Sequence, residues 1–166
     1  MGKEAFFEAG EPETRLWLEL KKRKWTITTV ESCTGGAVSA RIVNVAGASD
    51  ILKQAYVTYC DEAKHCLAGV SRETLDACTA VSAETAKEMA LGGARAAGAD
   101  VCVSVTGLAG PGGGTEEKPV GLVYVGCAAG GTVRVKELHL HGTRGEIRSQ
   151  AAEAALELAL ESVLLF

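Results

Sequence analysis

Ser32 and Thr34 carry the first side chains in this sequence whose type and position suggest chemistry. They lie in "ESCTGG", residues 31–36, directly after the β-branched run "WTITTV". Where a strand turns into a helix, the first helical amides have no intrahelical partner and can stabilise a developing negative charge. Ser32 is therefore a candidate nucleophile, although N-capping of the helix is the alternative role for both hydroxyls. A serine nucleophile also needs a base, and the 3 histidines form no recognisable serine–histidine–aspartate arrangement.

Lys64 is the candidate base, with Tyr59 as its candidate partner in proton transfer. Only a neutral amine accepts a proton, and burial or a positive neighbour lowers the pKa of a lysine toward that state. Tyr59 stands at the expected end of a strand, where it could relay the proton or donate a hydrogen bond. A solvated lysine on a helix is the alternative, because spacing alone does not establish contact.

A glycine-rich segment, "TGLAGPGGGT" at residues 106–115, is the second candidate loop. Glycines let the backbone approach a ligand closely, and consecutive amides can form an anion-binding nest. The segment lacks the Gly-Lys-Ser/Thr ending of a P-loop, and its glycine spacing does not fit G-x-G-x-x-G. Phosphate binding, oxyanion binding and a plain flexible loop therefore all remain open.

Metal and disulfide chemistry are disfavoured. His139 and His141 share one face of an expected strand, but without a nearby third ligand they indicate a solvated strand face. None of the 6 cysteines falls in a C-x-x-C pair, so we expect them to be mostly small hydrophobic residues. No metal and no cofactor are predicted.

The elements that must position these loops alternate between strands and helices. An α/β fold follows, with a mostly parallel or mixed sheet flanked by helices on both faces and an antiparallel hairpin at one side. Ligands in such folds bind beyond the carboxyl ends of the strands, where both candidate loops are expected. Strands are predicted at 25–30, 54–59 and 99–107, and at 118–129 and 131–142 around the turn Gly130–Gly131. Helices are predicted at 3–23 with a doubtful first half, at 37–45, at 61–69, at 82–98 with Ser82 as N-cap, and from the Thr143–Glu146 capping box to Phe166.

Composition limits the remaining possibilities. With 166 residues and 47% hydrophobic side chains, we expect one domain covering residues 1–166. A formal charge of -4 and a pI near 5.4 argue against nucleic acids and anionic membranes as partners. Neither a membrane span nor a signal peptide is recognisable, so a cytoplasmic location is expected.

Four segments together resemble the CinA C-terminal family, whose characterised activity is nicotinamide-nucleotide amidase. They are "TTVESCTGG", "VTYCDEAKHCLAGV", "AVSAETAKEMA" and "SVTGLAGPGGGTEEKPVGLVYVG", in this order and at these separations. The similarity extends from about residue 10 to the end of the chain. Many members carry a preceding molybdopterin-binding-like domain, and we expect the stand-alone form here.

The resemblance implies hydrolysis of the carboxamide of nicotinamide mononucleotide, giving nicotinic acid mononucleotide and ammonia. Ser32 matches the proposed nucleophile of the family, while Tyr59 and Lys64 match its proton-transfer partners. Arg144 matches an arginine that could bind the phosphate. The implied substrate-binding residues also include Glu31, Cys33, Thr34, Gly35, Asp61, Thr106, Gly107, Gly110, Gly112, Gly113, Gly114 and Thr115.

Two acidic residues leave the identity of the substrate open. The family usually has a serine and an asparagine where this chain has Cys60 and Asp61, so Asp61 could bind the cationic pyridinium ring or alter substrate choice. Glu31 could also hold that ring, or could be a buried structural carboxylate that accepts hydrogen bonds from loop amides.

Other classes of function are also open. The family is tied by name to competence and DNA damage, and a non-catalytic nucleotide-binding regulatory module would keep the glycine loop and Arg144 without a reactive serine. A purely structural or partner-binding domain would have no affinity for small molecules. Direct contact with nucleic acid is not expected, and a homo-oligomer is expected by analogy alone.

Overall fold

The strands form a mixed sheet, as the sequence pattern predicts. In residues 10–166, which the computed structural model describes, five strands lie in the order β2-β1-β3-β4-β5. Strand β1 pairs in parallel with β2 and β3, while β3, β4 and β5 pair in antiparallel fashion. Their bounds are β1 Ile27–Glu31, β2 Tyr56–Val57, β3 Val101–Gly107, β4 Leu122–Ala129 and β5 Thr132–His139.

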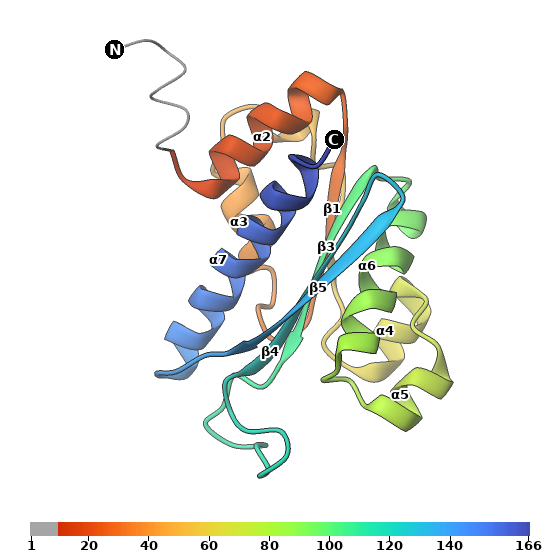
Figure 1. Ribbon diagram of the computed structural model, residues 1–166, viewed down its shortest axis with the longest axis vertical. Helices are drawn as coiled ribbons and strands as arrows, with labels where there is room; N and C mark the ends of the chain where they lie inside the picture. The colour runs from red at the N-terminus through yellow and green to blue at the C-terminus, as the bar shows by residue number, and fades with distance from the viewer. Residues whose placement is uncertain (1–9) are drawn as a thin grey trace.

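Helices cover both faces of this sheet (Figure 1). One face carries α2 Pro12–Arg23, α3 Ala37–Val43 and α7 Arg144–Val163, and the other carries α4 Asp61–Ala68, α5 Arg72–Cys78 and α6 Ala83–Ala97. A short 3-10 turn, η1 Ala48–Asp50, follows α3. The larger core cluster includes Val103 and Val105, and the smaller one includes Cys102 and Met89. Side chains of β3 therefore alternate between two apolar layers, so the predicted strand at 99–107 is buried on both faces.

Local signals predict the ends of these elements well. Gly130 and Gly131 have φ values of 55° and 81°, the positive values that a type I′ hairpin turn requires at both central positions. The hydroxyl of Ser82 accepts a hydrogen bond from the amide of Thr85 at the start of α6. A complete capping box, Thr143 with Glu146, begins α7. These three predictions are confirmed.

Several boundaries differ from prediction. Helix α2 begins at Pro12, and the part of the predicted helix before residue 10 lies outside the described residues. Strand β2 has only two paired residues rather than the predicted 54–59, because the chain turns into α4 directly after Tyr59. Helix α7 ends at Val163, short of the predicted Phe166. Helix α5 was not predicted, since it buries no residue and so has no apolar periodicity to detect.

Five of the 6 cysteines divide into two groups, and Cys78 is intermediate in exposure. Cys33, Cys102 and Cys127 are buried, as expected of small hydrophobic residues. Cys60 and Cys66 are exposed, so that expectation is wrong for them, because both lie on the outer side of α4 and its N-cap. On the exposed face of β5, His139 contacts Glu137 at 2.7 Å.

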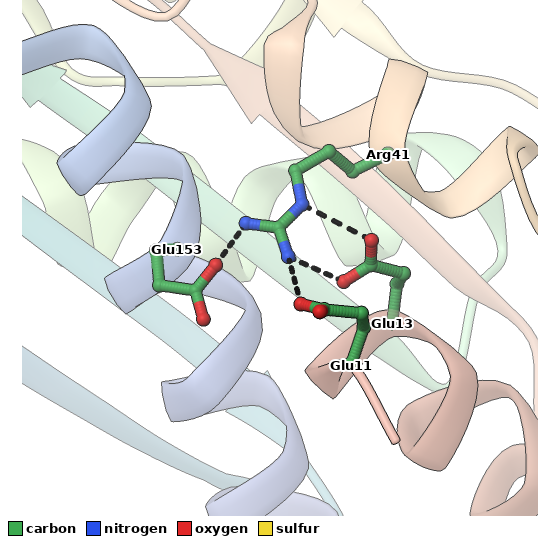
Figure 2. Close-up of polar contacts among 4 residues, drawn as sticks. All are labelled: Glu11, Glu13, Arg41 and Glu153. Carbon is green, nitrogen blue, oxygen red and sulfur yellow. Dashed lines mark hydrogen bonds and ion pairs between the residues drawn. The ribbon is translucent and has the colours of Figure 1, made fainter. Parts of the chain in front are cut away.

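An ion-pair cluster joins the three helices on one face (Figure 2). The guanidinium of Arg41 on α3 donates to Glu13 on α2 at 2.5 Å and 3.2 Å, and to Glu153 on α7. Glu11 lies 3.7 Å from the same guanidinium. The cluster links α2, α3 and α7 to one another through side chains that lie outside the two candidate loops.

Within residues 10–166, no helix combines the length and the apolar character that crossing a membrane requires.

Candidate active site

The two candidate loops meet at the end of the sheet where the parallel strands β1 and β3 finish. Since β1 and β3 are parallel neighbours, the segments that follow them leave the sheet at the same end. The amide of Ser32 donates to the carbonyl of Val105 at 2.9 Å, which places Ser32 beside the last residues of β3. A cleft of about 250 Å³ opens between the loops. Its lining includes ten of the predicted site residues: Ser32, Cys33, Tyr59, Asp61, Lys64, Thr106, Gly107, Gly110, Gly112 and Arg144.

A buried lysine contacts the candidate nucleophile. Nζ of Lys64 lies 3.2 Å from Oγ of Ser32 and donates to the carbonyl of Thr58 at 3.0 Å. Lys64 is 1% exposed, and in the described part of the chain no carboxylate lies within 4.0 Å of its amine. Burial lowers the pKa of Lys64, opposed by the nearby acidic groups of Asp61, Cys60 and Cys33. The site therefore shifts this amine toward its neutral form, in hydrogen-bond contact with a hydroxyl.

Cys33, the neighbouring thiol, is a poor competitor for the role of nucleophile. Its side chain is buried, and this burial raises the pKa of the Cys33 thiol to about 11. A thiol reacts as its thiolate, which is scarce at neutral pH when the pKa is raised in this way. The geometry and the burial both favour Ser32.

The carboxylate of Glu31 caps helix α3. Glu31 is fully buried, and its two oxygens accept four hydrogen bonds at 2.9–3.1 Å. The donors are the amides of Gly36, Val38 and Ser39 and the hydroxyl of Thr29. Neither Ser32 nor Thr34 caps α3, whose N-cap residue is Gly36. The expectation that the first amides of this helix are free is therefore wrong, and of the two roles considered for Glu31 the structure favours the structural one.

Arg144 and Tyr59 lie together at the rim of the cleft. Nη1 of Arg144 donates to the carbonyl of Gly110 at 2.7 Å, and Nη2 donates to the hydroxyl of Tyr59 at 2.8 Å. Tyr59 is 60% exposed. Within the described residues its hydroxyl has no hydrogen bond to Ser32 or Lys64, so the structure does not form the predicted proton relay through Tyr59.

The glycine segment has two parts with different roles. At Gly107 a Cβ would lie 2.6 Å from Cγ2 of Val123 and 2.7 Å from the carbonyl oxygen of Leu122, so only glycine allows this close approach of β3 and β4. Gly107, Gly110 and Gly112 line the cleft. The predicted residues Gly113, Gly114 and Thr115 do not, and Thr115 instead forms a tight turn by donating its amide to the carbonyl of Lys118 at 2.8 Å. Among the remaining predicted residues, Thr34 and Gly35 also lie outside the lining.

Lys118 is a residue that the sequence reasoning missed. Its ammonium donates to the carbonyls of Cys78 and Val81 at 2.9 Å and 2.8 Å, and to the hydroxyl of Thr79 at 2.6 Å. The hydroxyl of Thr106 donates to the carbonyl of Ala80 at 2.6 Å. Together these bonds fix the segment 78–81, whose Ala80 and Val81 form a further wall of the cleft. No local pattern could reveal this contact, because Lys118 and Cys78 are 40 residues apart.

Arg148 is a second missed cation. It lies on α7 one turn after Arg144, and its guanidinium binds the carbonyls of Cys33 and Thr34 at 3.0 Å and 2.8 Å. Its position four residues after Arg144 was the available signal, since residues at this spacing share a helix face.

Fold and site together define an α/β protein with a buried serine–lysine pair at the carboxyl edge of its parallel strands. Residues 11–163 match the family model described as the CinA C-terminal domain, and the chain belongs to this family. A "CinA-like protein" of Kosmotoga olearia is 51% identical over 145 residues, which are 87% of this chain. The chain spans only 35% of the length of that relative.

Solved structures support the same assignment. The competence/damage inducible protein CihA from Agrobacterium tumefaciens is 39% identical, with a TM-score of 0.87 over 90% of this chain and 93% of its own. A CinA superfamily protein from Klebsiella pneumoniae is 32% identical, with a TM-score of 0.89 over 93% of this chain and 97% of its own. The predicted α/β fold and the predicted family are confirmed.

Proposed function

We propose that this protein is an amidohydrolase that converts nicotinamide mononucleotide to nicotinic acid mononucleotide and ammonia. The observation that carries the proposal is the 3.2 Å contact between Oγ of Ser32 and the buried Nζ of Lys64. A lysine whose pKa is lowered by burial accepts a proton more readily at neutral pH than an exposed one. A hydroxyl beside a neutral amine is a known type of activated nucleophile.

Acylation begins at Ser32. Lys64 takes the hydroxyl proton while Oγ attacks the carboxamide carbon, and the carbonyl oxygen of the amide becomes an oxyanion. When this tetrahedral species collapses, the C–N bond breaks, and the proton held by Lys64 passes to the leaving nitrogen, which departs as ammonia. The substrate remains attached to Oγ as an ester.

Deacylation follows the same proton route in the opposite direction. Lys64, neutral again, takes a proton from water, and the resulting hydroxide attacks the ester carbon. Oγ of Ser32 leaves and recovers its proton from Lys64. The product is a carboxylate, and no metal enters any step of this scheme.

Charged groups at the cleft match the charges of the proposed substrate. Nicotinamide mononucleotide carries a cationic ring at one end and a phosphate at the other. Asp61 and Arg144 both line the cleft and provide one negative and one positive side chain. Side chains of opposite charge in one cleft can orient a ligand that has both signs, and the fork of an arginine suits phosphate oxygens.

Ammonia release from purified protein tests the proposal. Nicotinamide mononucleotide is compared with nicotinamide riboside, which lacks the phosphate, and with nicotinamide, which lacks both ribose and phosphate. We expect turnover of the mononucleotide, and a rise in KM of about 10- to 100-fold for the riboside if Arg144 binds the phosphate. Lys64→Met is expected to abolish turnover, while Lys87→Met on α6, whose side chain lies away from the cleft lining, should leave it unchanged.

Two results would overturn the proposal. Tight binding of the mononucleotide without ammonia release would assign the chain to the nucleotide-binding regulatory class instead. Neither binding nor turnover would favour a structural or partner-binding domain.

A further inference from the structure

The turn after Ser32 has carbonyls and amides at opposite ends. The amide of Gly35 donates to the carbonyl of Ser32 at 3.0 Å, which closes residues 32–35 into one tight turn. In such a turn the peptide units align, so that the carbonyls point one way and the amides the other. The carbonyls of Cys33 and Thr34 both point at the guanidinium of Arg148.

Each peptide unit of this turn is therefore fixed. A peptide bond is planar and trans, so its carbonyl and its amide point in opposite directions. Nε of Arg148 holds the carbonyl of Cys33, which directs the amide of Thr34 away from Arg148. The Ser32 carbonyl is held by the amide of Gly35, which likewise fixes the amide of Cys33.

The amides of Cys33 and Thr34 have no hydrogen-bond acceptor in residues 10–166. By contrast, the amides of Gly36, Val38 and Ser39 are taken by Glu31. Two consecutive unpaired amides form an anion-binding nest. Cys33 lines the cleft and directly follows Ser32, whereas Thr34 is fully buried and lies outside the lining, so the amide of Cys33 is the one next to the nucleophile.

We propose that Arg148 is a positioning residue, which holds the turn 32–35 so that the amide of Cys33 binds the oxyanion formed during attack by Ser32. The inference rests on the proposed function because it needs a nucleophilic Ser32. It does not depend on which substrate Ser32 attacks. Arg148 is suited to this role because in the described chain no carboxylate lies within 4.0 Å of it, and the two contacts it makes are with these carbonyls.

Reaction with a fluorophosphonate tests this inference without any amide substrate. Oγ of Ser32 displaces fluoride from phosphorus, its proton passes to Lys64, and the phosphoryl oxygen needs the same stabilising amide. The variants are Arg148→Ala and Arg148→Lys. Arg41→Met is the matched control, because Arg41 also ties α3 to α7, and within residues 10–166 its guanidinium binds the carboxylates in Figure 2 rather than carbonyls of the turn.

A specific set of rates is expected. Arg148→Ala should lower the rate constant for phosphonylation of Ser32 by roughly 100-fold, the effect of losing one oxyanion donor. It should lower kcat for ammonia release to a similar degree with little change in KM. Arg148→Lys, or guanidinium added to Arg148→Ala, should restore part of the rate. Arg41→Met should lower the melting temperature and leave the phosphonylation rate within about 3-fold of wild type, because it alters no oxyanion donor.

Contrary results separate the two proposals. The positioning role is wrong if Arg148→Ala is phosphonylated as fast as wild type. It is also wrong if added guanidinium accelerates phosphonylation of Arg148→Ala no more than it accelerates phosphonylation of Arg41→Met. The same holds if wild-type Ser32 does not react with the reagent. If wild type reacts and the Arg148 variants behave as expected, but nicotinamide mononucleotide is not hydrolysed, the proposed substrate is wrong and the positioning role stands.

Discussion

Replacing Glu31 with glutamine tests whether this carboxylate serves the fold or the substrate. Glutamine keeps the shape of the side chain but removes its charge and converts one oxygen into an NH₂ donor. Oε1 of Glu31 accepts from the hydroxyl of Thr29 and the amide of Ser39, and Oε2 accepts from the amides of Gly36 and Val38. In one orientation of the glutamine amide, the NH₂ group faces the amides of Gly36 and Val38. In the other it faces the amide of Ser39 and the hydroxyl of Thr29, which can rotate to accept.

The expected loss of stability follows from these contacts. In the less costly orientation, the buried amide of Ser39 loses a charged acceptor, which contributes about 1.5–3 kcal/mol. The two hydrogen bonds to the remaining oxygen lose about 1 kcal/mol each, because that oxygen is no longer charged. We therefore expect Glu31→Gln to lower the free energy of unfolding by about 4 kcal/mol. For a protein of this size, this corresponds to a fall in Tm of about 10 °C.

Urea unfolding followed by far-ultraviolet circular dichroism measures this loss. Glu62→Gln is the control, because Glu62 is exposed on α4 and its ion pair with Arg72 at 2.9 Å lies at the surface. The control should keep the wild-type midpoint. The reasoning is refuted if Glu31→Gln unfolds at the wild-type midpoint while its KM for nicotinamide mononucleotide rises, since Glu31 would then bind the substrate ring.

Three further predictions concern the cleft. Because burial lowers the pKa of Lys64, kcat/KM measured against pH should rise as Lys64 loses its proton and level off below lysine's ordinary pKa of about 10.4. At a pH between the lowered pKa of Lys64 in the folded protein and its ordinary pKa in the unfolded chain, the unfolded chain binds more protons than the folded protein. The free energy of unfolding should therefore increase with pH in this range, and Lys64→Met should remove the increase. Iodoacetamide at mildly alkaline pH, followed by peptide mass spectrometry, should modify the exposed Cys60 well before Cys33, which is buried and has a pKa raised to about 11; equal labelling would contradict this. Gly107→Ala should lower the free energy of unfolding by about 1–3 kcal/mol, because its Cβ would lie 2.7 Å from the backbone oxygen of Leu122; an unchanged urea midpoint would show that the strands can separate.

The parts of the fold that the sequence predicts depend on local signals. The hairpin needed only Gly130 and Gly131 between two β-rich runs, and α7 needed only the Thr143–Glu146 spacing. Strand β3 was recognisable because burial on both faces makes its sequence mostly apolar, with Ser104 and Thr106 as its polar residues. Helix α5 gave no such signal, since none of its residues is buried.

The site was only partly predictable, for a different physical reason. Alternation of strands and helices predicts that the segments after β1 and β3 meet, which brings Ser32 near the glycine segment. The contact between Ser32 and Lys64 spans 32 residues and followed from the family resemblance rather than from spacing. The contacts of Arg148 span 115 and 114 residues, and its role depends on carbonyl directions that no sequence pattern encodes.

Turnover by Ser32→Ala is the most direct test of the central claim, that a hydroxyl activated by a buried neutral amine attacks the amide. Ammonia release from nicotinamide mononucleotide is compared between this variant and wild type at equal protein concentration, after circular dichroism has shown that both are folded. Loss of the nucleophile should lower kcat by more than about 1,000-fold. Full turnover by Ser32→Ala would contradict the covalent mechanism.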